Sequence, residues 1–140
     1  MRIAGLDVGD KTIGVALSDE LGWTAQGLEV IRRKSAAHDF ARLAEIAKQY
    51  GVQSWVVGMP RNMNGTYGPR ADLTRTFMAL LTERLGLPVE SWDERLTTVA
   101  AERLLLEADV SRAKRRQVID KMAAAVILQG FLDARSRKGL

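Results

Sequence analysis

Cysteine is absent from this sequence, and histidine occurs once, as His38. Without cysteine the chain has no disulfide bond and no cysteine-based zinc site, and a Ser–His or Cys–His nucleophile finds no support. No apolar run approaches the roughly 20 residues of a membrane-spanning helix, and the N-terminus lacks the pattern of a secretory signal. These absences predict a cytoplasmic protein whose chemistry depends on carboxylates.

The composition is that of one globular domain. The chain has 140 residues, of which 46% are hydrophobic and 27% charged. A chain of this length buries roughly two-thirds of its unfolded surface, which is enough for a core. The sequence shows no internal repeat, low-complexity tract or interdomain linker, so we expect residues 1–140 to form a single domain.

Positive charge is concentrated near the C-terminus. Residues 1–110 contain 13 Lys and Arg against 15 Asp and Glu, whereas residues 111–140 contain 8 Lys and Arg against 2 Asp and Glu. Four of these cations, the basic cluster, stand almost together: Arg112, Lys114, Arg115 and Arg116. Cations at a helix N-terminus oppose the macrodipole, so helix stability does not explain them. The basic cluster is therefore a candidate contact for nucleic acid, with a solvated helix start as the alternative.

Hydrophobic periodicity predicts five strands and four helices. We expect strands at 2–8, 12–18, 25–31, 52–58 and 87–92, and helices at 37–50, 70–85, 98–107 and 112–134. The first three strands suggest an antiparallel meander, and the later strands alternate with helices. This order predicts an α/β fold in which a mixed five-stranded sheet, the meander plus parallel strands, has helices on both faces.

Acidic residues stand at strand ends and on an apolar helix. Asp7 ends the first strand, Asp93 and Glu94 end the last, and Asp120 opens the most hydrophobic stretch, 122–132. Acids are rarely placed against core faces unless a cation holds them. If the first, fourth and fifth strands are parallel neighbours, their carboxyl ends share one edge of the sheet. These acids could then bind Mg²⁺ or Mn²⁺ and support phosphodiester cleavage by two metal ions.

Two of these acids have simpler interpretations. Asp7 could be a turn-forming residue, but the Gly-Asp-Lys that follows supplies that turn. Gly5 and Gly9 are expected to leave room for a metal and a phosphate beside Asp7. Asp120 could instead form a surface ion pair with Arg116, one helical turn before it.

The loop between residues 59 and 70 is rich in glycine, proline and asparagine. Loops of this length inside compact domains are usually functional, and the alternative is a surface loop without a special role. The helix start that follows could hold a phosphate, and Tyr67 could stack on a base. With the first turn, this loop gives the candidate nucleic-acid contacts Lys11, Arg61, Asn64, Tyr67 and Arg70.

Four motifs resemble, in the same order, those of the YqgF/RuvX family. They are GLDVG at 5–9 with TIGVA at 12–16 and SD at 18–19, VGMP at 57–60 with NG at 64–65, DERLTT at 93–98, and DKMAAAVIL at 120–128. Each motif alone is a weak signal, whereas four in order over nearly the whole chain are specific. Met59 stands where leucine is expected, which leaves the acidic residues unaffected.

The resemblance implies an RNase H-like fold related to the RuvC Holliday-junction resolvases. The catalytic residues and ligands for Mg²⁺ or Mn²⁺ that it implies are Asp7, Glu94 and Asp120. Adjacent residues on a regular strand point to opposite faces, so one of Asp93 and Glu94 is expected at the metal, and the resemblance favours Glu94. Asp93 is then the alternative ligand, or it supports the site by binding Arg95 or Thr98.

The function implied by the resemblance is cleavage at the 5′ end of pre-16S rRNA during ribosome biogenesis. The alternatives are a Holliday junction resolvase and a non-catalytic nucleic-acid-binding module, although idle carboxylates would repel phosphates. A sugar kinase or ATPase would use the same Asp-x-Gly hairpin, but that class needs two such domains. A related resolvase acts as a symmetric dimer, so the resemblance also allows a homodimer.

Overall fold

The computed structural model describes residues 2–60, 66–93 and 112–137, and within the last range it describes the side chains of residues 122–135. The elements, in chain order, are β1 (Arg2–Val8), β2 (Thr12–Ser18), β3 (Ala25–Arg32), α1 (Ala36–Tyr50), β4 (Val52–Met59), α2 (Pro69–Leu85), β5 (Val89–Asp93) and α4 (Arg112–Arg137). The helix predicted at 98–107 lies outside the described residues. None of the described helices combines the length and apolar character needed to cross a lipid bilayer.

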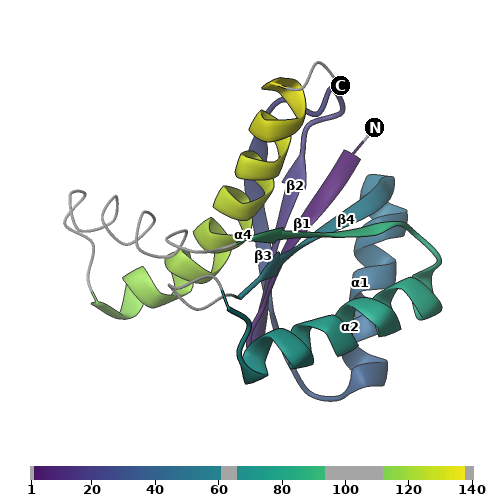
Figure 1. The fold of residues 1–140 in the computed structure, drawn as a ribbon, viewed down its shortest axis with the longest axis vertical. Helices are drawn as coiled ribbons and strands as arrows, with labels where there is room; N and C mark the ends of the chain where they lie inside the picture. The colour runs from purple at the N-terminus through teal and green to yellow at the C-terminus, as the bar shows by residue number, and fades with distance from the viewer. Residues whose placement is uncertain (1, 61–65, 94–111, 138–140) are drawn as a thin grey trace.

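The strands form one mixed sheet in the order β3-β2-β1-β4-β5 (Figure 1). The β1–β2 and β2–β3 pairs are antiparallel, and the β1–β4 and β4–β5 pairs are parallel. The predicted meander and the parallel arrangement of the first, fourth and fifth strands are therefore confirmed. As a result, β1, β4 and β5 all end at the same edge of the sheet.

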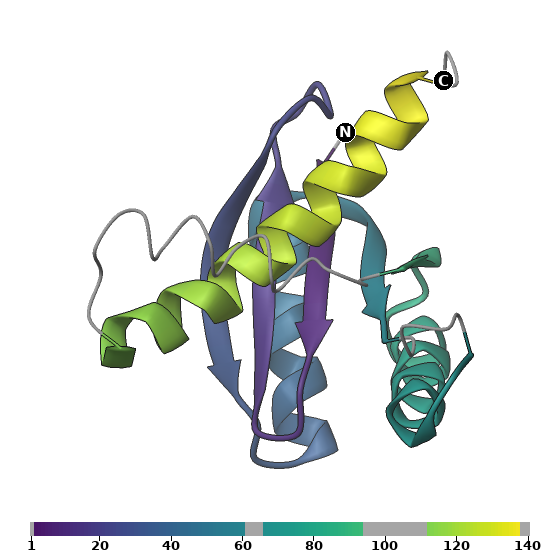
Figure 2. The same ribbon diagram turned by 60° about the vertical axis from the view of Figure 1, so that its left-hand side comes forward.

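Helices cover both faces of this sheet, as predicted. The long α4 crosses one face, and α1 and α2 lie on the other (Figures 1 and 2). One core cluster joins α1 and α2 to the sheet through residues such as Leu6, Trp55 and Phe77. A second cluster joins α4 to the sheet through residues such as Ile3 and Leu128. Because strand residues alternate between the faces, cluster membership assigns each strand side chain to one face.

The helix boundaries follow local sequence signals. Ser35 accepts a hydrogen bond from the backbone N–H of His38 at 3.1 Å and caps α1, while Pro69 occupies the first turn of α2. Both helices end at a glycine in the left-handed conformation, Gly51 with φ 68° and Gly86 with φ 69°, which glycine adopts without strain. The last strand starts at Val89, two residues later than predicted.

Candidate active site

The acids predicted at the strand ends belong to the shared carboxyl edge of β1, β4 and β5. In the sheet register, Leu6 of β1 pairs with Val57 of β4, and Val57 pairs in turn with Ser91 of β5. Asp7 and Asp93 are therefore separated by the end of β4 and differ by one residue in register. The sequence prediction placed both acids at this edge, and the sheet topology confirms that placement.

Asp7 faces the side of the sheet that α4 covers. Its neighbours Leu6 and Val8 both belong to the core on the α1 and α2 side, so strand alternation turns Asp7 toward α4. The residue is half-buried. A half-buried carboxylate at a strand end, rather than a fully solvated turn residue, fits the interpretation of Asp7 as a ligand.

Asp93 faces the opposite side. Trp92 packs edge-on against Phe131 of α4, with ring centroids 6.2 Å apart, whereas Val89 packs into the core under α1 and α2. Side chains along β5 therefore alternate regularly between the two faces. By this alternation Asp93 is directed to the face covered by α1 and α2, away from Asp7. Glu94, the expected ligand, and Arg95 and Thr98, the expected partners of Asp93, lie outside the described residues.

The expected role of Gly5 beside Asp7 is wrong. A Cβ atom at Gly5 would lie 2.7 Å from the Cβ of Leu128 and 3.0 Å from the carbonyl oxygen of Ala124, so α4 packs directly on the β1 backbone there. A Cβ atom at Gly9 would lie 3.2 Å from the carbonyl oxygen of Thr12, across the β1–β2 turn. Both glycines permit close approach of protein backbone, and at Gly5 the packing of α4 leaves no space for a ligand.

The contact at Gly5 also places the start of the C-terminal motif. Ala124 and Leu128 are one helical turn apart and both touch position 5. Asp120 lies one further turn toward the N-terminus of α4, so it belongs to the same helical face by spacing. Its side chain lies outside the described residues, as do those of Arg116 and the rest of the basic cluster. Among the residues that the structure does describe, no three acidic or histidine side chains form a metal-binding group.

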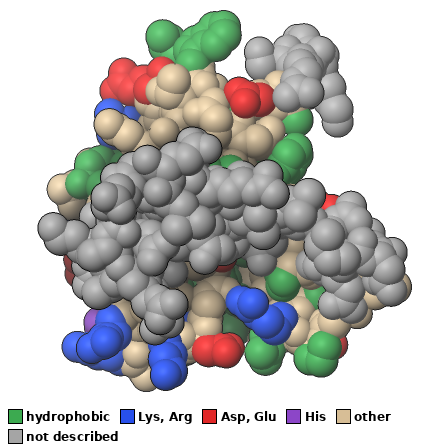
Figure 3. All heavy atoms as spheres, turned by 90° about the vertical axis from the view of Figure 1, so that its left-hand side faces the viewer, with side chains coloured by type: hydrophobic (Ala, Val, Ile, Leu, Met, Phe, Trp, Pro, Cys, Tyr) green, Lys and Arg blue, Asp and Glu red, His purple; other side chains and the backbone are tan. Residues whose placement is uncertain are grey.

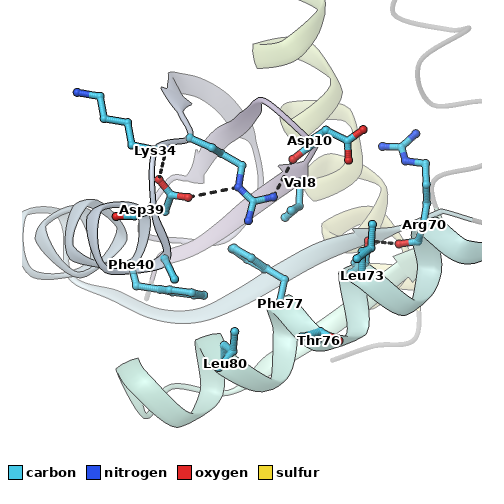
Figure 4. A pocket seen from close by; sticks show the side chains of 15 residues that line it. Val8, Asp10, Lys34, Asp39, Phe40, Arg70, Leu73, Thr76, Phe77 and Leu80 are labelled. Atoms are coloured by element: carbon cyan, nitrogen blue, oxygen red, sulfur yellow. Dashed lines mark hydrogen bonds and ion pairs between the residues drawn. The ribbon is translucent and has the colours of Figure 1, made fainter.

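A buried acid that the sequence analysis did not single out fixes the turn after Asp7. Asp39, whose side chain is 3% exposed, accepts a hydrogen bond from Arg33 Nε at 3.3 Å and one from the backbone N–H of Lys34 at 3.2 Å. Arg33 Nη1 in turn donates to the carbonyl oxygen of Gly9 at 2.9 Å (Figure 4). The backbone N–H of Arg33 donates to the carbonyl oxygen of Lys11, also at 2.9 Å. We call Arg33 and Asp39 the turn clamp.

The environment of the turn clamp sets the charge of Asp39. Burial raises the pKa of its carboxyl group, but hydrogen bonds with His38, the Lys34 backbone and Arg33, together with the charge of Arg33, outweigh burial and hold the pKa below its usual value. His38 Nδ1 lies 3.0 Å from Asp39 Oδ1. Asp39 is therefore an anion at neutral pH and neutralises Arg33 beside the turn.

Residues 1–134 of the chain match a family described as RuvX, Holliday junction resolvase. This chain belongs to the RuvX family. The resemblance seen in the four motifs is thereby confirmed. Two relatives of this RuvX chain, from Symbiobacterium thermophilum and Moorella thermoacetica, carry the name "Putative pre-16S rRNA nuclease". The first is 77% identical over 99% of this chain and 96% of that protein, and the second is 62% identical over 100% of both.

Solved structures support the fold of the RuvX chain. Thermus thermophilus RuvC in complex with a Holliday junction substrate has a TM-score of 0.60 at 18% identity and covers 98% of this chain and 96% of that one. The fowlpox virus Holliday junction resolvase has a TM-score of 0.56 at 12% identity and covers 96% and 99%. At these identities the likeness shows the fold alone, which is the RNase H-like fold of the RuvC resolvases.

The candidate nucleic-acid contacts of the RuvX chain are described in part. Lys11 is exposed in the β1–β2 turn, and Arg70 is exposed in the first turn of α2. Tyr67 is 49% exposed, and the guanidinium of Arg75 lies over its ring at 4.6 Å, so one face of the ring has a partner. Arg61 and Asn64 lie outside the described residues. Figure 3 shows Lys and Arg side chains gathered along the lower part of one face of the molecule.

The contact between Gly5 and α4 gives a first prediction. Gly5→Ala should destabilise the RuvX chain by about 1–3 kcal/mol, because the added methyl group overpacks against Leu128 and the helix must shift. The shift should also lower nuclease activity, since α4 carries Asp120. Gly27→Ala is the matched control, because Gly27 is exposed on β3 and its φ is not positive. Urea unfolding and a cleavage assay check both; equal stability of the two variants would contradict the packing argument.

The turn clamp gives a prediction about acid stability. The folded-state pKa of Asp39 is lowered, so its carboxylate stabilises the fold above about pH 4, and that contribution is lost as pH falls through the lowered pKa. Asp39→Asn should therefore reduce the free energy of unfolding at pH 7 by about 1–3 kcal/mol and flatten its decline in acid. Asp72→Asn, at a side chain that is 79% exposed, should change neither. Urea unfolding between about pH 7 and pH 3 measures these differences, and identical pH profiles for wild type and Asp39→Asn would contradict the prediction.

Proposed function

We propose that this chain is a metal-dependent nuclease that cleaves phosphodiester bonds at the 5′ end of pre-16S rRNA during ribosome biogenesis. The observation that carries the proposal is the 77% identity, over 99% of the chain, to a relative whose name states that activity. The placement of Asp7, half-buried at the carboxyl edge and turned toward α4, supports it. An enzyme acting on ribosomal RNA precursors would work in the cytoplasm.

The residues at the carboxyl edge fit Mg²⁺ or Mn²⁺. The candidate donors are carboxylate oxygens, which hard divalent cations prefer, and the sequence has no cysteine and only one histidine. We propose that Asp7, Glu94 and Asp120 hold the metal. When bound, two such ions would activate water and stabilise the leaving oxygen of a phosphodiester.

Glu94 is the better candidate than Asp93 for the ligand from β5. Asp7 faces α4. Because β5 alternates regularly, the side chain of Asp93 is directed to the opposite face of the sheet, which α1 and α2 cover. A ligand that joins Asp7 must approach from the α4 side, and the family motif offers Glu94 as the next carboxylate. Asp93 is then a supporting residue whose partners stabilise the end of the strand.

The chain's own residues have further tasks in the proposed reaction. The turn clamp fixes the β1–β2 turn and with it the direction of the Asp7 carboxylate. The close contact of α4 with Gly5 fixes the distance between the sheet and the helix that carries Asp120. Cations at the same edge, among them Lys11 and Arg70, would hold the phosphates on either side of the cleaved bond.

Resolution of Holliday junctions is the second candidate function. The description of the matching family supports it, as does the fold shared with a resolvase bound to its junction. The homodimer that a resolvase would need stays a prediction. The deciding experiment incubates the purified chain and Mg²⁺ with a 5′-extended 16S rRNA fragment and, separately, with a four-way DNA junction. We expect cleavage of the RNA; exclusive cleavage of the junction, in paired strands, would favour the resolvase.

A further inference from the structure

A cavity of about 480 Å³ lies between α1 and α2 at the carboxyl edge of the sheet. Residues Val8, Gly9 and Asp10 form part of its wall, so the cavity begins directly after Asp7 in the chain. It opens on the face of the sheet opposite to α4. A substrate strand that is bound at Asp7 and continues across the β1–β2 turn would therefore run into this cavity.

The cavity has an apolar wall. Phe77 and Leu80 of α2 and Phe40 of α1 line it, and Leu73 lies beside them (Figure 4). Leu73 is 64% exposed, which is unusual for a leucine within a polar helix surface. The rings of Phe40 and Phe77 are stacked with centroids 5.0 Å apart. Phe40 and Phe77 are each 4% exposed and belong to the core behind the cavity, so Leu73 is the exposed apolar side chain that this wall offers to the flat face of a nucleobase.

The mouth of the cavity is cationic. Lys34 and Arg70 lie on opposite sides of the cavity, and the Lys34 side chain extends outward from its rim, away from Phe77 and Leu73 (Figure 4). Within the described residues neither side chain takes part in an ion pair. The third cation, Arg33, is neutralised by Asp39 and lies over the ring of Phe77 at 5.7 Å. Asp10 is the remaining acid of the lining, so Lys34 and Arg70 leave the mouth with a net positive charge.

We propose that this cavity, the α1–α2 groove, binds a single-stranded segment of the substrate next to the cleaved bond, with phosphates on Lys34 and Arg70 and a base against Leu73. The inference rests on the proposed nuclease function and deepens it, because it assigns a subsite on the far side of the sheet from α4. Two observations carry it: Lys34 and Arg70, which form no ion pair with any side chain that the structure describes, complement a polyanion, and the groove is continuous with the turn after Asp7. The apolar wall is suited to the base of a nucleotide, and the cationic mouth is suited to its phosphate.

The test is a binding titration of the full-length chain with fluorescein-labelled single-stranded RNA in EDTA, at several KCl concentrations. Lys34→Ala and Arg70→Ala should each weaken binding by about 3–10-fold and reduce the slope of log K against log salt by about 0.7, the value for one phosphate contact on a single strand. The matched control is Lys48→Ala, in the last turn of α1 and outside the lining of the groove. It should bind within about twofold of wild type.

A second pair of variants tests the apolar wall. Leu73→Glu places an acid in the groove and should weaken RNA binding more than about tenfold. Leu21→Glu is the control, because it makes the same change at another exposed leucine, 78% exposed, that does not line the groove. Both positions are exposed, so both variants should fold. With Mg²⁺, Lys34→Ala and Leu73→Glu should raise KM for RNA and leave kcat near that of wild type.

The outcomes separate the two proposals. If wild type binds and cleaves RNA but the groove variants match their controls, the groove is not a substrate subsite and the nuclease proposal stands. If wild type neither binds nor cleaves nucleic acid, the nuclease proposal fails and the groove proposal fails with it. Weakened binding confined to the groove variants supports both.

Discussion

Asp7→Asn should reduce RNA cleavage by at least about a thousandfold, which corresponds to roughly 4 kcal/mol of transition-state stabilisation. An amide lacks the negative charge that holds a divalent cation, and Asp7 is the one proposed ligand whose side chain the structure describes at the carboxyl edge. The fold should survive, because Asp7 is half-buried at a strand end and belongs to neither core cluster.

The matched control for Asp7→Asn is Asp133→Asn, which makes the same chemical change at an exposed position of α4. Single-turnover cleavage should be unchanged in this control and nearly absent in Asp7→Asn. Thermal melts with Mn²⁺ give a readout apart from activity: wild type and Asp133→Asn should be stabilised by the metal through mass action, and Asp7→Asn much less so. Full activity of a folded Asp7→Asn protein would remove Asp7 from the site.

The second large effect distinguishes the two adjacent acids of the third motif. Glu94→Gln should lower cleavage by at least about a hundredfold and reduce the stabilisation by Mn²⁺, whereas Asp93→Asn should keep activity within about tenfold of wild type. The reason is the alternation of β5, in which Trp92 faces α4 and Asp93 does not. A ligand on the far face of the sheet cannot share a metal with Asp7.

The same assays, run on both variants side by side, decide this assignment. The stabilisation by Mn²⁺ separates a lost ligand from a weakened support, because a supporting residue should leave the metal-induced shift in Tm in place. Loss of both activity and metal stabilisation in Asp93→Asn, with an active Glu94→Gln, would exchange the two roles. It would also mean that the alternation of side chains along β5 does not extend to Asp93.

The positions of the strands, and the edge of the sheet at which Asp7 and Asp93 lie, could be predicted from the sequence. Strands at 2–8 and 12–18 begin and end where predicted, because alternating or continuous apolar runs between turn residues leave little choice of register. Glycines at 51 and 86 end their helices as expected, since few other residues adopt positive φ without strain. The last strand begins later than predicted, after Pro88, which cannot donate a hydrogen bond to a neighbouring strand.

What the sequence could not give depends on contacts between distant segments. Gly5 was expected to make room for a ligand, but the space beside it is filled by Leu128, which is distant in the chain. Asp39 has the sequence context of an ordinary acid near a helix start, and its burial against Arg33, Lys34 and His38 is visible only in the folded structure. The pairing of Arg33 with Gly9 has no local pattern at all, because a backbone carbonyl acceptor leaves no mark on sequence.

The central claim is that this chain hydrolyses RNA with divalent metal bound at the carboxyl edge. The most direct test incubates purified wild-type protein with a 5′-extended 16S rRNA fragment in Mg²⁺, in Mn²⁺ and in EDTA, and determines the chemistry of the new ends. We predict cleavage in both metals and none in EDTA, with 5′-phosphate and 3′-hydroxyl ends, because an activated water would attack the phosphorus and the P–O3′ bond would break, with the 3′ oxygen as the leaving group. Cleavage that persists in EDTA, or that leaves 2′,3′-cyclic phosphate ends, would contradict the account.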